Sequence, residues 1–487
     1  MSSTDAAGTG TDAPATERII GPVLFLDDLT AEAMHLAALF IVPHGQAPGP
    51  VTAQGQEVPA TVIARYRRCD IHRARFALPL AGGSYRWEGA AHPVAGLGAD
   101  ALRLAYVSCN GEETGDMERE GSERNAMWAR LRASHEAQPF ALLLHGGDQV
   151  YADEVTHGHP LSEDWPDSWP EDPDPAAMEG LREHLRERFL ARYAAIYAAP
   201  DLAALAARIP SLMQWDDHDI CDGWGSLSRA ATASAMGQAV FAAAREAYLT
   251  FQAAAAEGDL PPRFADPAGG HLGWAVHGAG LRLYAPDLRS ERGRRQVMGP
   301  GGWAMAEAEA ARASSGHTFL LSSVPLLGPR LSILEYLMMA VPQMQKYEDD
   351  LRDQWQSRAH RGEWRRMLEL VRSMAAADGQ DITAVSGEIH LATRTEMELG
   401  GGRVLNQLVA SGIAHRPPPA AWARTLGTLA SLGEAPLPGH PIRIRPLPGQ
   451  RHRYAAERNW LLLERRGARW SASWDLEHAG PTPPLPL

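Results

Sequence analysis

Five short apolar runs in this chain are each followed at once by polar residues, and this pattern limits the fold more than any other feature. The runs LRLAYV, FALLL, SLMQW, TFLLS and DITAV end at residues 107, 144, 215, 322 and 385. Segments with helical character separate them, at residues 122–138, 175–198, 226–257 and 346–374. Such alternation of strands and helices is typical of an α/β layer built on a buried sheet. We also expect Ser122 to be the N-cap of the first of these helices.

The N-terminal part of the chain has a different pattern. Residues 17–97 contain the short apolar or alternating runs VLFL, LAALFIV, TVIARYRR and ARFALPL, each bounded by Gly, Pro or Asp. These runs predict a small β-sandwich-like domain. Residues 1–16 are small and polar, which favours a disordered tail, and the turn-rich stretch at 92–100 marks the boundary to a second domain spanning residues 98–487.

Composition excludes several classes of protein. Apolar residues make up 45% and charged residues 22% of the 487 positions, as in ordinary globular proteins. The net charge of −13 disfavours nucleic acid and anionic membrane as partners, so we expect a small-molecule ligand. The chain has only three cysteines and no apolar leader at its start, from which we expect a reduced protein in the cytoplasm.

Potential metal ligands stand directly after four of the five apolar runs. The polar segments are SCNG at 108–111, GGDQVYADE at 146–154, DDHDICDGWG at 216–225, SVP at 323–325 and SGEIH at 386–390. In an open α/β sheet, functional side chains gather in the loops at the carboxyl ends of the strands. The sequence therefore predicts one metal site assembled from residues nearly 300 positions apart.

The residue types indicate what such a site binds. Carboxylates, imidazole and phenolate suit hard or borderline cations, and a pair of cations needs a carboxylate that bridges them. Asp148 is the candidate bridge, because Gly146 and Gly147 before it allow a tight backbone turn. Tyr151 lies within reach of the same ion, and a phenolate ligand favours ferric iron. Asp217 and His218 stand together in the next segment.

These blocks resemble the PhoD-like branch of the calcineurin-like metallophosphoesterases. That family has a strand ending in Ser-Cys, then GDxxY, DDHE-type and SGDxH-type blocks; here they are Ser108–Cys109, GDQVY at 147–151, DDHD at 216–219 and SGEIH at 386–390. A weaker block at 285–299 matches a strand followed by Asp-x-Arg through Asp287 and Arg289. Order and approximate spacing agree over residues 100–480.

The resemblance implies a fold and a set of roles. The fold would be a four-layer αββα metallophosphoesterase sandwich with a small N-terminal β-sandwich-like domain. Ferric iron would be bound by Cys109, Asp148 and Tyr151. A second ion, calcium or another divalent ion such as manganese, zinc or magnesium, would share Asp148 and use Asp217, Glu388 and His390.

The resemblance also implies a hydrolase of phosphate monoesters, diesters or both, in which a metal-bound hydroxide attacks phosphorus. His218, oriented by Asp219, would protonate the leaving oxygen or hold the phosphoryl group, and Arg289 would clamp the phosphate. The alternative is a catalytically weak metal-binding or scaffold member of the same fold.

The chain departs from the family pattern at two points, and two of its blocks also have a purely structural interpretation. Glu388 stands where the family usually has Asp, which leaves the second metal open, and the absence of an export signal leaves the substrate open. Residue by residue, Cys109 is also compatible with a small buried packing residue and DDHD with a solvated turn or helix cap. The segments at 163–175 and 324–342 are candidate lids over the site.

Overall fold

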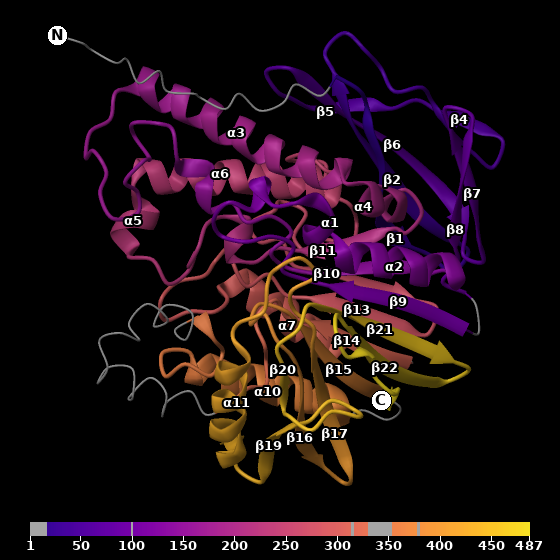
Figure 1. Cartoon of the computed structure of the whole chain (residues 1–487), viewed down its shortest axis with the longest axis vertical. Helices are drawn as coiled ribbons and strands as arrows, with labels where there is room; N and C mark the ends of the chain where they lie inside the picture. Colours follow the sequence, from indigo (N-terminus) through magenta and orange to yellow (C-terminus); the bar gives the residue numbers. More distant parts are fainter. Residues whose placement is uncertain (1–16, 99–100, 313–315, 330–352, 377–379) are drawn as a thin grey trace.

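The computed structural model describes residues 17–98, 101–312, 316–329, 353–376 and 380–487. Two large sheets form its centre, one built mainly from the first half of the chain and the other from the second half (Figure 1). In the described residues, no helix is both long and apolar enough to cross a membrane.

The first sheet has eleven strands in the described chain, and β9, β10, β11 and β1 at its centre run parallel. Its central strands are nearly continuous apolar runs, as expected for strands covered on both faces. In spatial order the strands are β23 (Gly480–Pro481), β22 (Arg469–Leu476), β21 (Asn459–Arg466), β9 (Ala101–Val107), β10 (Leu142–Gly146), β11 (Ser211–Gln214), β1 (Ile20–Leu29), β2 (Ala33–Pro43), β6 (Cys69–Pro79) and β5 (Thr61–Arg65), with β24 (Leu485–Pro486) beside β22.

The second sheet has nine strands in the described chain, and β13, β14, β15 and β17 run parallel in it. In spatial order the strands are β12 (Trp274–Gly278), β13 (Leu281–Ala285), β14 (Gly316–Leu321), β15 (Gln380–Ser386), β17 (Arg403–Val409), β16 (Ala392–Gly400), β19 (His440–Arg445) and β18 (Glu434–Leu437), with β20 (Tyr454–Ala455) beside β16. All five runs singled out in the sequence are therefore strands, three in the first sheet and two in the second.

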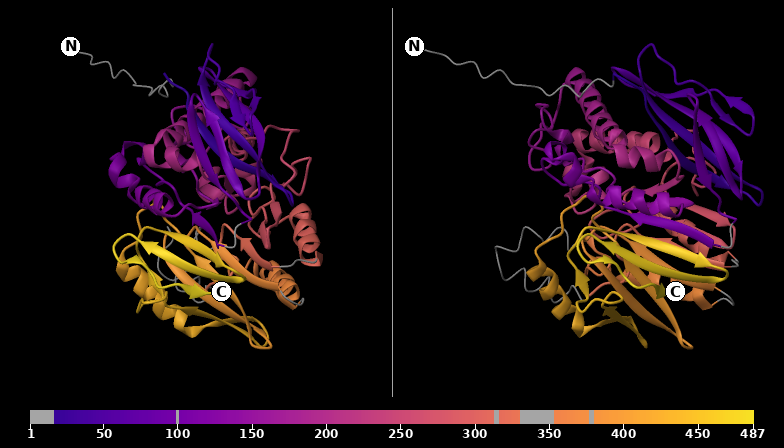
Figure 2. Two further views of the ribbon diagram at one scale, coloured as in Figure 1. Left: turned by 90° about the vertical axis from the view of Figure 1, so that its right-hand side faces the viewer. Right: turned by 45° about the vertical axis from the view of Figure 1, so that its right-hand side comes forward.

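The N-terminal strands form a sandwich-like arrangement that shares a sheet with the rest of the molecule. A separate four-stranded sheet consists of β4 (Gln56–Val58), β3 (Val51–Ala53), β7 (Gly82–Trp87) and β8 (Ala90–Ala95). It packs on β2 and β6 through Phe40 against Trp87 and Phe76 against Tyr85, with ring centroids 5.1 and 5.2 Å apart. In both views of Figure 2 these indigo strands lie at the end of the molecule away from the second sheet.

Helices cover the outer face of each large sheet (Figure 1). Those on the first sheet's side are α1 (Gly121–Arg124), α2 (Ala126–Ala137), α3 (Pro175–Ala198), α4 (Pro200–Ala206), α5 (Arg229–Ala233) and α6 (Ala235–Ala247). Those on the second sheet's side are α7 (Pro300–Ala311), α10 (Arg361–Ala376) and α11 (Ala420–Leu429). One apolar core joins the two sheets, and the indole of Trp474 on β22 donates to the carbonyl of Val409 on β17 at 2.8 Å. This order of layers confirms the predicted αββα fold.

Local signals in the sequence explain some helix ends and not others. Helix α3 begins at Pro175, and the side chain of Asp174 caps it by accepting from the amide of Ala177 at 3.0 Å. The prediction for Ser122 is wrong, because the side chain of Glu120 caps α1 and Ser122 lies inside that helix. Helix α10 begins at residue 361, and residues 346–352 of the expected helix lie outside the described chain.

Candidate metal centre

The loops that follow the five predicted strands meet at one place between the two sheets. The amide of Asn110 donates to the carbonyl of Asp148 at 2.8 Å, and the amide of Ala152 donates to the carbonyl of His218 at 2.8 Å. On the second sheet, the amide of Gly387 donates to the carbonyl of Ser323 at 3.3 Å. Residues far apart in sequence thus form one cluster, as the strand-end pattern predicts.

Backbone strain is concentrated in this cluster. Eight non-glycine residues of the described chain have positive φ, and four of them are predicted metal ligands: Cys109 (55°), Asp148 (55°), Glu388 (69°) and His390 (52°). Such conformations cost about 1–3 kcal/mol each and persist where the surrounding structure enforces them. The fold therefore holds these four side chains in orientations that relaxed loops would not adopt.

The two glycines before Asp148 are needed because the loop is closely packed. Gly147 has φ of 110°, and a Cβ there would lie 2.6 Å from the Cβ of Asp216. A Cβ on Gly146 would lie 1.8 Å from the hydroxyl of Tyr106. A side chain at Gly147 would push the loops carrying Asp148 and Asp216 apart, and one at Gly146 would displace the ring of Tyr106 on β9.

Three carboxylates form the centre of the cluster. Asp148, Asp216 and Asp217 each offer an oxygen, and these three atoms lie within 4.8 Å of one another. Burial raises the pKa of Asp148 well above its ordinary value, and the charge of Asp216 adds to this effect. Burial likewise raises the pKa of Asp216 to about 6. Carboxylates this close and this buried repel one another unless a cation or proton lies between them.

Cys109 and Tyr151 lie beside Asp148, as predicted. The thiol of Cys109 is 3.3 Å from Oδ2 of Asp148 and 3.1 Å from the hydroxyl of Ser411. Burial raises the pKa of both Cys109 and Tyr151 well above their ordinary values, and the neighbouring Asp148 raises both further. A metal ion reverses this effect, because coordination favours the thiolate and the phenolate.

Asp219 has a role other than the one expected. Its carboxylate accepts hydrogen bonds from four backbone amides and one side-chain amide, at 2.8–3.2 Å: those of Asp148, Gln149, Val150, Asp216 and Gln252. Gln252 ends the π-helical turn Tyr248–Gln252 that follows α6. Asp219 therefore fixes the loop that presents Asp148 and does not orient His218.

The partner of His218 is Asp153, on the short 3-10 helix Asp153–Thr156. Nδ1 of His218 lies 3.0 and 3.1 Å from the two carboxylate oxygens of Asp153. The imidazole also stacks on the ring of Tyr151, with centroids 4.3 Å apart. Burial alone would lower the pKa of His218, but the carboxylates of Asp153 and Asp217 outweigh it and raise the pKa well above its ordinary value.

The prediction that Arg289 clamps a substrate phosphate is contradicted by its surroundings. Arg289 is fully buried, and its guanidinium donates to Asp216, to Asp217 at 3.3 Å, to Asp353 at 2.6 Å and to the carbonyl of Trp224 at 2.8 Å. Its backbone amide donates to Asp287 at 2.9 Å. These contacts leave the guanidinium no free edge for a substrate, so Arg289 positions Asp216 and Asp217 instead.

Glu388 lies in the loop after β15, and one of its two carboxylate oxygens accepts a hydrogen bond. Its Oε1 accepts from the side-chain amide of Gln354 at 2.6 Å. Burial raises the pKa of Glu388 well above its ordinary value, and the charge of Asp216 adds to this effect. Gln354 was not predicted as a site residue, since no apolar run stands directly before it in the sequence.

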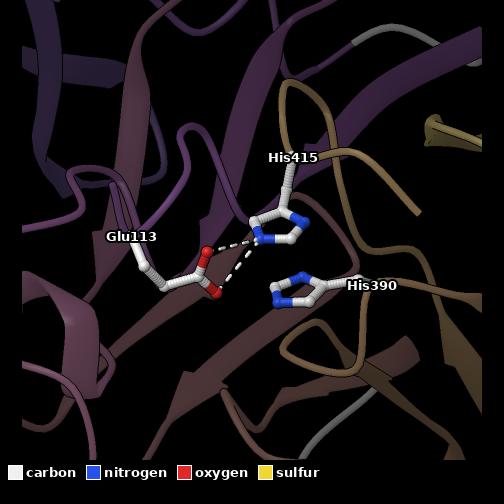
Figure 3. Close-up of side chains that lie close together, drawn as sticks. All are labelled: Glu113, His390 and His415. Carbon is white, nitrogen blue, oxygen red and sulfur yellow. Dashed lines mark hydrogen bonds and ion pairs between the residues drawn. The ribbon is translucent and has the colours of Figure 1, made fainter. Parts of the chain in front are cut away.

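His390, a predicted ligand, lies in a second candidate group with Glu113 and His415, two residues that the sequence pattern did not indicate (Figure 3). Its ring stacks on that of His415 with centroids 3.5 Å apart, and Nε2 of His415 lies 3.2 Å from Oε1 of Glu113. One ligand atom from each of these three residues lies within 4.8 Å of the others. The signal was available, because Glu113 follows Cys109 in the same loop and His415 follows the apolar strand β17.

The cluster opens into a cavity of about 670 Å³. Its polar wall includes Asp148, Asp217, His218, Glu388 and His390. None of the described lining residues belongs to the first candidate lid, 163–175, whose Trp165 is buried and donates to the carbonyl of Ala231 at 3.3 Å. Of the second candidate lid, 325 and 327–329 line the cavity, whereas 330–342 lie outside the described chain.

The residues present fit bound metal ions. Five buried ligand-type atoms of the cluster find no hydrogen-bond partner among the described residues: Asp148 Oδ1, the hydroxyl of Tyr151, Asp216 Oδ2, Glu388 Oε2 and His390 Nδ1. Leaving one such atom unpaired costs about 1–3 kcal/mol. Oxygen donors with imidazole, thiol and phenol groups beside them are the ligand types of hard and borderline cations. Coordination would satisfy all five atoms at once.

Comparisons with known proteins agree with this fold. The family model described as PhoD related phosphatase matches residues 92–348, more than half of the chain. An uncharacterised protein of Saccharomyces cerevisiae is 23% identical over 392 residues, a match that covers 62% of this chain and 55% of that protein. The chain thus spans about half the length of the curated relative it matches.

Two solved structures share the fold. The structure of PhoD superposes with a TM-score of 0.59 at 12% identity, over 96% of this chain and 88% of that chain. A purple acid phosphatase from seeds of yellow lupin (Lupinus luteus) superposes with a TM-score of 0.53 at 9% identity, over 96% of this chain and 73% of that chain. At such low identity the likeness concerns the fold.

Proposed function

The chain belongs to the family of PhoD-related phosphatases, and we propose that it hydrolyses phosphate esters with the help of metal ions held between its two sheets. The observation that carries this proposal is the convergence of five unpaired buried ligand-type atoms from three strand-end loops, and three of these atoms belong to residues that line one cavity. A scaffold would gain nothing from strained ligands that face a cavity of substrate size.

The candidate ligands divide into three neighbouring groups in this proposal. Cys109, Tyr151 and the shared carboxylate of Asp148 would hold ferric iron, while Asp216, Asp217 and Glu388 would complete the site of a second ion. His390 joins Glu113 and His415 instead of this carboxylate group, because one ligand atom from each of these three residues lies within 4.8 Å of the other two. Calcium, manganese, zinc and magnesium are the candidates for the second ion.

Hydrolysis of the ester needs charge stabilisation and proton transfer. The ions, when bound, would supply Lewis-acid stabilisation of charge on the phosphoryl group. A water oxygen bonds to phosphorus, the phosphorus–oxygen bond to the alcohol breaks, and the proton lost by water is balanced by one gained by the leaving oxygen.

His218 is the residue placed to donate that second proton, since it lines the cavity and its Nδ1 is held by Asp153. A proton at Nε2 can then reach the leaving oxygen. Asp153 is a positioning residue, because it acts on the imidazole and does not touch the substrate.

The direct test is hydrolysis of an aryl phosphate monoester and an aryl phosphate diester after loading with iron and one divalent ion. We expect turnover with at least one ester, and a loss of about a thousandfold or more in Asp148→Asn. Asp164→Asn, a change at an exposed residue of the 163–175 loop, is the matched control. Protein that binds no iron and hydrolyses neither ester with any added ion would overturn the proposal.

A further inference from the structure

The cavity that contains the metal cluster also has an apolar wall, and we propose that this wall binds an apolar alkyl or aryl group of the phosphate ester. The inference rests on the proposed function and adds the chemical class of the substrate. It would make the preferred substrate an ester of an apolar alcohol, with the phosphate directed at the metal cluster.

The apolar wall comes from five separate parts of the chain. It consists of Leu327 after β14, Leu391 and Val409 at the ends of the second sheet's strands, Trp422 and Leu426 on α11, and Tyr454 on β20. Trp422 and Leu426 are four residues apart and therefore lie on the same face of α11. Both are half-buried, whereas Leu391, Val409 and Tyr454 are buried.

The apolar wall and the metal ligands share one continuous space. Ile389 and Leu391 alternate with Glu388 and His390 along one short segment, and all four line the cavity. A volume of about 670 Å³ lies within the range that accommodates small organic ligands, and an orthophosphate group would occupy only part of it. The remaining space is bounded by the apolar wall.

The charges of the lining restrict the rest of the substrate. Glu112, Glu113, Asp222 and Asp353 line the cavity as well, and none of its described lining residues is Lys or Arg. Bound cations would serve one phosphoryl group, but additional phosphates would have no cationic side chain to meet in this lining. The wall therefore favours an uncharged apolar group over a nucleotide or a polyphosphate.

The test is a chain-length series of esters. We would measure kcat/KM for methyl, butyl and octyl phosphate, and for the corresponding 4-nitrophenyl diesters, each below its critical micelle concentration. We expect kcat/KM to rise at least about tenfold from methyl to octyl, because methylene groups leave water on binding. Trp422→Ala and Leu426→Ala should each reduce this octyl-to-methyl ratio several-fold.

The control is Val404→Ala on β17, a change at a residue that is 40% exposed and does not line the cavity. A second measurement is calorimetric binding of methyl, butyl and octyl phosphonate to metal-loaded protein. It gives the affinity of the wall for each chain length and does not require hydrolysis. Equal affinities and equal kcat/KM along the series, or a preference that neither variant reduces, would overturn the inference and leave the proposed function intact. Failure to hydrolyse any ester would overturn the proposed function, and the phosphonate series would still decide whether the wall binds apolar chains.

Discussion

Asp153 holds His218: the carboxylate of the first lies 3.0 Å from Nδ1 of the second, although 65 positions separate them in the chain. The two residues come from the loops after the neighbouring parallel strands β10 and β11. Asp219, the direct sequence neighbour of His218, instead accepts hydrogen bonds from the backbone amides of the Asp148 loop. In the proposed mechanism, the acidic block at 216–219 therefore supplies metal ligands and a proton donor, while Asp219 fixes the Asp148 loop.

The first prediction concerns Asp153. Replacement by Asn keeps the size of the side chain and removes the charge that fixes the imidazole, so kcat should fall about 10- to 100-fold. KM and the iron content should stay within about twofold, because Asp153 is not in the proposed ligand set. Steady-state kinetics with elemental analysis check this, with Asp167→Asn at an exposed position as control. An unchanged kcat in Asp153→Asn would show that His218 does not depend on this contact.

The second prediction concerns Arg289. Because its guanidinium is buried among Asp216, Asp217 and Asp353, Arg289→Gln leaves these charges uncompensated and should cost about 3–5 kcal/mol in free energy of unfolding. Urea unfolding followed by circular dichroism measures this, and the exposed Arg295→Gln is the control. Unchanged stability together with a raised KM would instead indicate a phosphate clamp.

The sequence predicted the strands and most of the cluster because apolar runs and ligand-type residues are local signals. It placed Cys109, Asp148, Tyr151 and Asp217 near one another, and they are. It could not assign partners, since the contacts of His218 and Arg289 depend on how loops after different strands face one another. It also could not show that β1 pairs with β11 and joins the N-terminal strands to the first sheet.

The third prediction concerns Glu113 and His415. If their group with His390 holds an ion, Glu113→Gln and His415→Ala should each lower the number of bound divalent ions by up to one per chain. Iron content should remain, because Cys109 and Tyr151 are untouched. Elemental analysis after dialysis measures both. Glu112→Gln is the matched control, since Glu112 is the neighbouring acid and pairs with Arg416 at 2.9 Å. Equal ion content in all three variants would assign His390 to the carboxylate group.

The fourth prediction compares two glycines with positive φ. At Gly147 a methyl group would lie 2.6 Å from the Cβ of Asp216, whereas at Gly158 the nearest atom is 3.7 Å away. Gly147→Ala should therefore cost about 3 kcal/mol and abolish metal binding, because Asp148 and Asp216 must move apart. Gly158→Ala should cost about 1 kcal/mol and leave metal binding intact. If both variants lose the same stability and metal binding, the positive φ alone causes the loss, and the contact with Asp216 does not contribute.

The last prediction concerns Glu388, which stands where the family usually has Asp. Its longer side chain lets Oε1 reach Gln354 at 2.6 Å while Oε2 is left for an ion. Glu388→Asp withdraws the carboxylate by about one carbon–carbon bond, so it should weaken binding of the second ion about 10- to 100-fold. Competition with a metal-sensitive dye measures this affinity. Gln354→Leu separates the two effects, because it removes the hydrogen bond and keeps the length of residue 388. If Glu388→Asp binds every divalent ion as tightly as the parent chain does, Glu388 is not a ligand and the second ion depends on Asp216 and Asp217 alone.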